Sequence, residues 1–344
     1  MTGLAATCIV MLILQSGFCL TRADGGFVVP LTYHLYESDQ RALVVFDEDQ
    51  QKEELYVQAG FRGDITDFAW IIPVPSVPEV DTADADLFDE AERLTRPSYR
   101  HRGHDGGCAC GNEIVTTPLG GQDGGVVVYG ESTVGIYATR IVGADSSAVL
   151  ADSLTAWGYL HGANYDEVVE TLDFYVERDW VFVAMRVEEP DVDQPYPDYS
   201  YRGGTEPVHL SFDTVEPVYP MRISAMSADD ISTVTVYVCA DHRMTFPGAD
   251  TRYANKINAS ELRAIREHYA HLGAILPEGC FLTKLRRQFT PDQMDSDILF
   301  VRADSDREFH EIHYSGFPPI EGLLALAIGV GIHLYWRRRI GDSE

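Results

Sequence analysis

The feature that most constrains this chain is an apolar run over residues 317–336, close to its C-terminal end. Three arginines, Arg337, Arg338 and Arg339, follow the run directly. A helix of about twenty residues crosses the roughly 30 Å hydrocarbon core of a bilayer, and clustered arginines mark the cytoplasmic side. A buried core helix is the alternative, but such a helix would rarely be apolar on all sides and then end in three consecutive cations. The sequence therefore predicts one transmembrane helix over residues 317–336, followed by a cytoplasmic tail over residues 337–344.

The opposite end has the pattern of an export signal. Residues 4–14 are mostly apolar, a stretch too short to span a bilayer, and the small residues Thr21 and Ala23 form an acceptable cleavage pattern. We predict a signal peptide over residues 1–23 and an extracytoplasmic domain over residues 24–316. The segment before the apolar stretch has no Lys or Arg, so an uncleaved signal anchor is an alternative. Acylation of Cys19 is a weaker one, because Phe18 fits the lipoprotein pattern poorly.

The predicted extracytoplasmic domain is strongly acidic. It holds 51 Asp and Glu against 22 Lys and Arg, so its net charge is 22 − 51 = −29, and its only lysines are Lys52, Lys256 and Lys284. Such a surface repels nucleic acids and anionic lipids, which excludes a nucleic-acid partner. Because 45% of the residues are hydrophobic, the chain can bury a sizeable core. We expect one large folded domain, or two intimate ones, with an acidic shell.

Four cysteines remain in the predicted mature domain: Cys108, Cys110, Cys239 and Cys280. An even number of cysteines in an exported protein favours disulfides, and four cysteines allow three pairings. A bridge within Cys-x-Cys is strained. We therefore consider the pairing of Cys108 or Cys110 with Cys239 or Cys280 to be sterically easier, and the sequence does not fix the connectivity further.

Strands outnumber helices in the hydrophobic pattern, and neighbouring strands resemble hairpins. This pattern predicts an α+β fold with a largely antiparallel sheet and several packed helices. Residues 188–206, rich in proline, aspartate and tyrosine, are a surface excursion and a candidate seam between subdomains. Helices are expected at residues 84–94 (with Asp81, Thr82 or Asp84 as the cap), 146–157, 165–177 and 259–272. Strands are expected at residues 42–46, 55–59, 68–72, 126–129, 134–141, 180–187, 208–212, 221–225, 234–239, 281–288, 298–301 and near Phe309, with a long loop over residues 96–125.

One group of residues has metal-ligand chemistry at short spacing. His101, His104, Cys108 and Cys110 offer four nitrogen and sulfur ligands within ten residues of the predicted loop, enough for a Zn or Cu site if the thiols are reduced. Disulfides are the simpler interpretation of the cysteines in an oxidising compartment. Two further His-x2-His pairs are His268/His271 and His310/His313. An acidic run, Asp81, Asp84, Asp86 and Asp89, could hold calcium, but it lacks the EF-hand spacing, and a helix N-terminus explains it equally well.

Four blocks of sequence occur in order at residues 67–78 with 86–88, 175–184, 210–212 with 217–224, and 282–285. Together they resemble the bacterial family known as domain of unknown function 2330. The resemblance implies an exported envelope protein, sometimes with a C-terminal anchor, and it implies no activity and no catalytic residues. Where many members of that family begin the mature chain with Cys-Gly-Gly, this chain has Asp24-Gly25-Gly26.

The motifs of common hydrolases, nucleotide-binding proteins and dehydrogenases are absent from the sequence. We therefore predict a membrane-anchored, non-enzymatic binding or interaction module of the cell envelope, with an envelope protein as a possible partner. The alternative is a metal-dependent extracytoplasmic enzyme or redox protein that uses the loop from His101 to Cys110.

Overall fold

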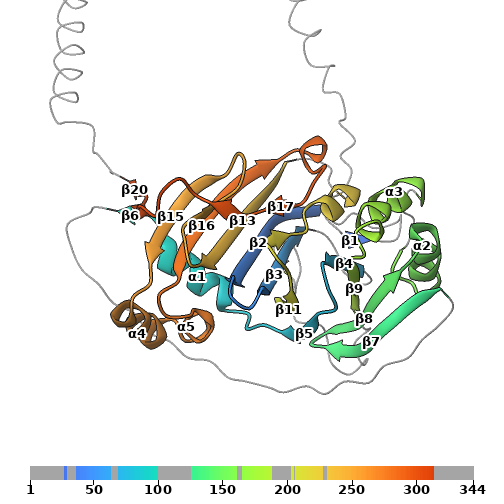
Figure 1. Ribbon diagram of the computed structural model, residues 1–344, viewed down its shortest axis with the longest axis horizontal. Coiled ribbons are helices and arrows are strands. Elements are labelled where there is room, and N and C mark those ends of the chain that lie inside the picture. Colours follow the sequence, from blue (N-terminus) through green and yellow to red (C-terminus); the bar gives the residue numbers. More distant parts are fainter. Residues whose placement is uncertain are drawn as a thin grey trace, which may run out of the picture.

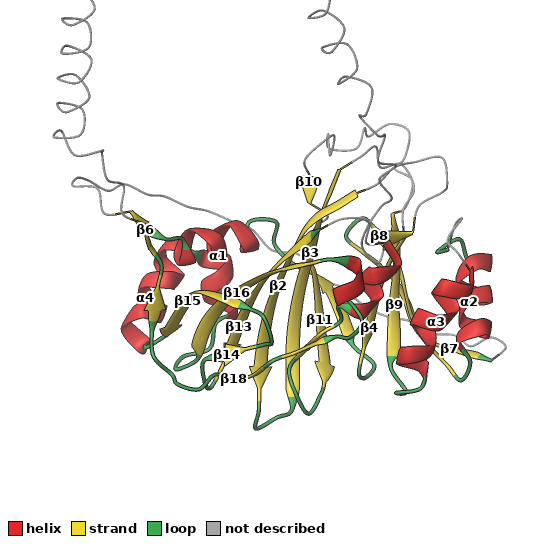
Figure 2. Cartoon of the chain, turned by 90° about the horizontal axis from the view of Figure 1, so that it is seen from above, coloured by secondary structure: helices red, strands yellow, loops and turns green. Residues whose placement is uncertain are grey.

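The computed structural model describes residues 27–28, 36–62, 69–99, 125–160, 165–187, 203–204, 206–227 and 231–313. Two sheets dominate this part of the chain, and helices gather at opposite ends of the molecule (Figures 1 and 2). Helices α1 (Leu87–Thr95) and α4 (Ala259–His268) lie at one end, and α2 (Ser147–Ala156) and α3 (Tyr165–Val176) lie at the other. One apolar core lies between the sheets, and two others lie between a sheet and its helices. The layers are thus helix, sheet, sheet, helix, and the predicted sheet-rich α+β fold is confirmed.

The first sheet has five strands in the order β1, β4, β9, β8, β7, and all neighbours are antiparallel. Helices α2 (Ser147–Ala156) and α3 (Tyr165–Val176) cover one face, where Leu150 and Leu172 pack against Phe182. The strands are β1 (Phe27–Val28), β4 (Ala69–Val74), β7 (Val126–Val134), β8 (Tyr137–Ala144) and β9 (Val181–Val187).

The second sheet has nine strands in the order β19, β15, β16, β13, β2, β3, β11, β5, with β10 beside β3. Only the pair β13 and β2 is parallel. Its strands are β2 (Tyr36–Asp47), β3 (Lys52–Arg62), β5 (Glu79–Thr82), β10 (Gly203–Gly204), β11 (Val208–Asp213), β13 (Ser232–Ala240), β15 (Asp250–Lys256), β16 (Phe281–Phe289) and β19 (Phe309–His310). The helices on its outer face are α1 (Leu87–Thr95), α4 (Ala259–His268) and α5 (Ala270–Ile275).

Short elements complete the described fold. β12 (Val218–Tyr219) pairs with β17 (Ile298–Leu299), β14 (Met244–Thr245) with β18 (Val301–Arg302), and β6 (Ser98–Tyr99) with β20 (Ile312–His313). Two 3-10 helices are η2 (Arg222–Ser227) and η3 (Pro291–Gln293).

The two-sided burial of the second sheet explains its nearly continuous apolar strands. Along β2, Ala42 and Val44 point into the core between the sheets, whereas Leu43 points into the core beneath α1 and α5. Successive side chains of a strand point to opposite faces, so a strand covered on both faces loses the alternation of apolar and polar residues. Each fully buried aliphatic side chain of this kind contributes about 1.5–3 kcal/mol.

One carboxyl group lies inside the core region between the sheets. Glu53 of β3 is fully buried, and its Oε2 accepts a hydrogen bond from the Val218 backbone N–H at 2.9 Å. Burial raises the pKa of Glu53 well above 4.5, which the bond to Val218 opposes. The Glu53 carboxyl group therefore stays protonated to a higher pH in the folded chain than in the unfolded chain.

Three predicted elements differ from the structure. Residues 221–225, predicted as a strand, belong mostly to the 3-10 helix η2, because Met221 and Ile223 enter different cores. The single helix predicted at residues 259–272 is two helices that break at Tyr269, whose φ of −139° is not helical. The first helix begins at Leu87 with Asp86 as its N-cap, not with Asp81, Thr82 or Asp84.

Strand β4 continues through Pro73 to Val74, beyond the strand predicted at residues 68–72. Pro73 lies within the strand and is opposite Phe182 of β9. On its other side β4 pairs with β1 only at Ala69 and Trp70, so within the described chain one side of Pro73 faces no strand. A residue without an N–H is tolerated at such a half-paired position.

Several sequence predictions fall outside the described residues. These are the signal peptide (residues 1–23), the transmembrane helix (residues 317–336), the tail (residues 337–344) and most of the candidate seam (residues 188–206). Among the residues that are described, no helix is both long and apolar enough to cross a membrane. On either side of the candidate seam, β9 belongs to the first sheet and β11 to the second.

Candidate binding cleft

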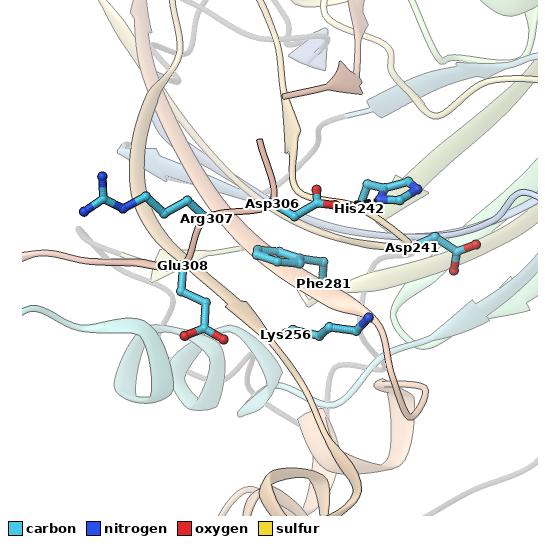
Figure 3. Close-up of a pocket in the computed structure, with 7 residues that line it drawn as sticks. All are labelled: Asp241, His242, Lys256, Phe281, Asp306, Arg307 and Glu308. Carbon is cyan, nitrogen blue, oxygen red and sulfur yellow. Dashed lines mark hydrogen bonds and ion pairs between the residues drawn. The ribbon is translucent and has the colours of Figure 1, made fainter. Parts of the chain in front are cut away.

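A cleft of about 520 Å³ opens at one end of the second sheet. Asp241 and His242 follow β13, Lys256 ends β15, and Phe281 begins β16. In the antiparallel register Phe281 is opposite both Ala240 and Lys256, which brings these strand ends together. The segment before β19 closes the cleft with Asp306, Arg307 and Glu308 (Figure 3).

A histidine and an aspartate form a fixed pair at the cleft. The Nδ1 atom of His242 lies 2.9 Å from Oδ2 of Asp306, whose other oxygen accepts the Arg243 backbone N–H at 3.0 Å. The hydrogen bond with His242 is the largest cause of the lowered pKa of Asp306, and the nearby Arg302 adds to it. Asp306 is therefore a carboxylate at neutral pH, and it favours the His242 tautomer that carries its proton on Nδ1.

The remaining lining residues combine both signs of charge around one aromatic ring. Phe281 is almost fully buried and lies between two groups of polar side chains. Figure 3 shows Asp241, His242 and the Lys256 ammonium group on one side of this ring, and Arg307 and Glu308 on the other. The lining therefore presents both signs of charge, and a ligand that carries both charges could contact both kinds of group.

A disulfide fixes the two central strands of the cleft. Cys239 and Cys280 are bonded, and their Cα atoms are 5.8 Å apart. This corrects the pairing that we considered easier, in which one of these cysteines bonds to Cys108 or Cys110. Cys239 lies two residues before Asp241, and Cys280 directly precedes Phe281, so the bridge joins the backbone segments that carry the cleft.

The residues predicted as a metal site are not placed by the structure. His101, His104, Cys108 and Cys110 lie outside the described residues, as do Arg337, Arg338 and Arg339. The binding of Zn or Cu at that loop therefore stays a prediction.

The other histidine pairs have separate surroundings. His310 packs edge-on against Tyr253, and Nδ1 of His268 bonds to the Ala264 carbonyl oxygen. Nδ1 of His271 lies 3.0 Å from Oδ2 of Asp84. The spacing of three residues thus does not bring His268 and His271 to a common partner.

The cleft leaves little local signal in the sequence, because its residues are isolated and far apart along the chain. His242 has no His-x2-His partner, and Asp306 lies 64 residues away from it. One signal was present: Lys256 is one of only three lysines in the chain. A cation that is this rare on an acidic protein was the one residue of the cleft that stood out in the sequence.

The sequence matches one family along most of its length. The model of the family described as "uncharacterized protein conserved in bacteria (DUF2330)" covers residues 21–301. The chain belongs to DUF2330. The matched range includes Asp241, His242, Lys256 and Phe281 of the cleft, and it ends before Asp306.

Comparisons beyond DUF2330 add little to this assignment. A search of curated proteins finds no match. Among solved structures, a crystal structure of baculovirus P35 is similar at a TM-score of 0.33 and 11% identity, over 81% of this chain and 97% of that chain. We draw no conclusion on fold or function from a likeness of this size.

Proposed function

We propose that this DUF2330 protein is a membrane-tethered, extracytoplasmic binding module whose cleft takes a small ligand that carries both a cationic and an anionic group. The observation that supports this most is the composition of the cleft. Lys256 and Arg307 can meet an anionic group, Asp241 and Glu308 can meet a cationic one, and Phe281 provides an apolar base. Amino acids and short peptides have this combination of groups.

The lining favours binding over covalent catalysis. None of the seven residues that line the cleft is Ser, Thr or Cys, so the pair of His242 and Asp306 has no hydroxyl or thiol beside it in the lining to activate. Asp306 instead holds the segment before β19 through Arg243 and His242. We therefore assign to this pair the shaping of the cleft wall.

Ligand binding is tested with the full-length chain in detergent and a panel of amino acids, dipeptides and tripeptides. We expect saturable binding by calorimetry, weakened roughly tenfold by Lys256→Ala or Arg307→Ala, because a hydrogen bond to a charged group is worth about 1.5–3 kcal/mol and these side chains are exposed. Lys52→Ala is the matched control, since Lys52 lies on β3 and does not line the cleft. Equal losses in all three variants, or no binding by any compound, would contradict the proposal.

Tethering rests on the apolar run and the arginines that follow it. We expect the full-length chain to stay in the membrane fraction after carbonate extraction, and a chain that ends at Gly316 to become soluble, because about twenty apolar residues are what a bilayer retains. Deletion of residues 340–344 is the control, since it leaves the run and all three arginines in place. A membrane-bound chain without residues 317–344 would disprove the anchor.

A further inference from the structure

The acidic run before α1 and the second histidine pair, which are far apart in the sequence, meet in the structure. Asp84 and Asp86 precede helix α1, and His271 is the second residue of α5, which lies beside α1 (Figure 1). One ligand atom from each of these three residues lies within 4.8 Å of the other two. We propose that Asp84, Asp86 and His271 form a binding site for a divalent transition metal ion of the zinc type.

The packing between the two helices fixes the position of His271. The backbone N–H of its neighbour Leu272 donates to Oε2 of Glu90 at 2.8 Å, and both residues are buried. Leu272 also shares an apolar core with Leu87 and Phe88 of α1. The imidazole is thus held opposite the two aspartates by contacts that do not depend on a metal, as preorganised sites require.

The aspartates are ordered by local hydrogen bonds that leave ligand atoms available. The backbone N–H of Asp86 donates to Oδ1 of Asp84 at 2.9 Å, and the other oxygen of Asp84 contacts His271. The Asp86 side chain is exposed and makes no hydrogen bond or ion pair with another described residue. A neutral imidazole leaves two negative charges at this position, which one divalent cation would balance.

The donor set determines which cation fits. Calcium takes oxygen ligands, whereas zinc binds imidazole nitrogen at about 2.0–2.1 Å and carboxylate oxygen at about 2.0–2.2 Å. The calcium set that the sequence suggested is not assembled. Asp89 pairs with Arg41 at 3.1 Å, and the side chain of Asp81 accepts the Thr82 backbone N–H. Three protein ligands at the surface leave a fourth tetrahedral position for water.

The proposal is tested by calorimetric titration of Zn²⁺ into the metal-stripped full-length chain in detergent. We expect His271→Ala to bind about one equivalent less Zn²⁺ than the unaltered chain. Asp86→Asn should weaken the same binding event at least tenfold, the smaller end of the losses typical even for outer-shell partners. His268→Ala is the matched control, because this histidine bonds to a carbonyl oxygen and not to the aspartates.

The titration compares the number of Zn²⁺ equivalents that each variant and the unaltered chain bind. Zinc held at the loop from His101 to Cys110 is common to all of them and does not obscure the difference. Circular dichroism checks that each variant is folded. If His271→Ala does not fold, Asp86→Asn decides the matter, since an exposed aspartate that caps α1 without a side-chain bond can be replaced by asparagine with little structural change. The same Zn²⁺ stoichiometry and affinity in the unaltered chain, His271→Ala and Asp86→Asn would overturn the proposal, as would Ca²⁺ displacing Zn²⁺ at equal concentration.

Discussion

Replacing Cys239 and Cys280 together with alanine is expected to lower the free energy of unfolding by about 2–4 kcal/mol. The bridge joins residues 41 positions apart, and the loop that it closes contains β15, α4 and α5. Without the bridge the unfolded chain gains conformational freedom, and a loop of this length corresponds to roughly 4 kcal/mol in the chain-entropy description. Urea unfolding followed by tryptophan fluorescence measures the change.

Reduction distinguishes the contribution of this bridge to stability from that of any disulfide made by Cys108 or Cys110. The unaltered chain should lose stability when it is reduced, whereas the double variant Cys239→Ala/Cys280→Ala should lose little further stability on reduction. The loss should extend to the cleft, because Asp241 lies two residues after Cys239 and Phe281 directly follows Cys280. A double variant as stable as the unaltered oxidised chain would show that the strand register alone holds this end of the sheet.

The pairing of Cys239 with Cys280 could not be predicted from the sequence. All four cysteines were visible, but pairing depends on which strands are neighbours. β13 and β16 are antiparallel, and Cys239 is opposite Leu282, so Cys280 lies just beyond the paired end. That register joins residues distant in the chain, and no local pattern encodes it.

The fold class was predictable because its signal is local. The apolar runs at residues 42–46 and 55–59 are β2 and β3, and the helical spacing at residues 146–157 and 165–177 is α2 and α3. The parallel pair of β2 and β13 was not predictable, since it joins strands about 200 residues apart. The family was recognisable because its blocks are contiguous segments, and the family match covers them.

The candidate sites were predictable only in part, for the same reason. The two segments that contribute to the proposed metal site were each visible in the sequence, one as an acidic run and the other as a histidine pair. In the structure, two residues of the acidic run meet one histidine of the pair, because α5 packs on α1. Spacing within one segment predicts sites on one loop or helix, and sites built between helices need the tertiary fold.

Tyr175→Phe is expected to lower the free energy of unfolding by roughly 2–3 kcal/mol at neutral pH. The Tyr175 hydroxyl donates to Oδ1 of Asp297 at 2.7 Å and accepts the Ile223 backbone N–H at 2.9 Å. Asp297 also accepts the Arg222 backbone N–H at 3.0 Å, so this partly buried network connects α3, η2 and the segment before β17. Phenylalanine keeps the packing but leaves a buried N–H and a half-buried carboxylate with one partner fewer.

The loss should grow as the pH rises, which a simple packing defect would not produce. Burial raises the pKa of Asp297 above 3.8, and the hydrogen bond from Tyr175 opposes that rise by favouring the charged form. Without the hydroxyl the folded pKa is higher still. A carboxyl group whose folded pKa is raised contributes most below its unfolded pKa, and this contribution is lost as the pH rises through the folded value. The difference between the two chains is therefore smallest near pH 4 and increases toward pH 7.

Tyr165→Phe is the matched control for urea unfolding at pH 4.5 and pH 7.5. Tyr165 is on the same helix and bonds to Asp152, but it is exposed, so its loss should change stability by less than about 0.5 kcal/mol at either pH. An equal effect of the two substitutions would mean that the bond between Tyr175 and Asp297 contributes nothing to the stability of the fold. A large loss for Tyr175→Phe that does not vary with pH would assign the effect to the bond with Ile223 and not to the carboxylate.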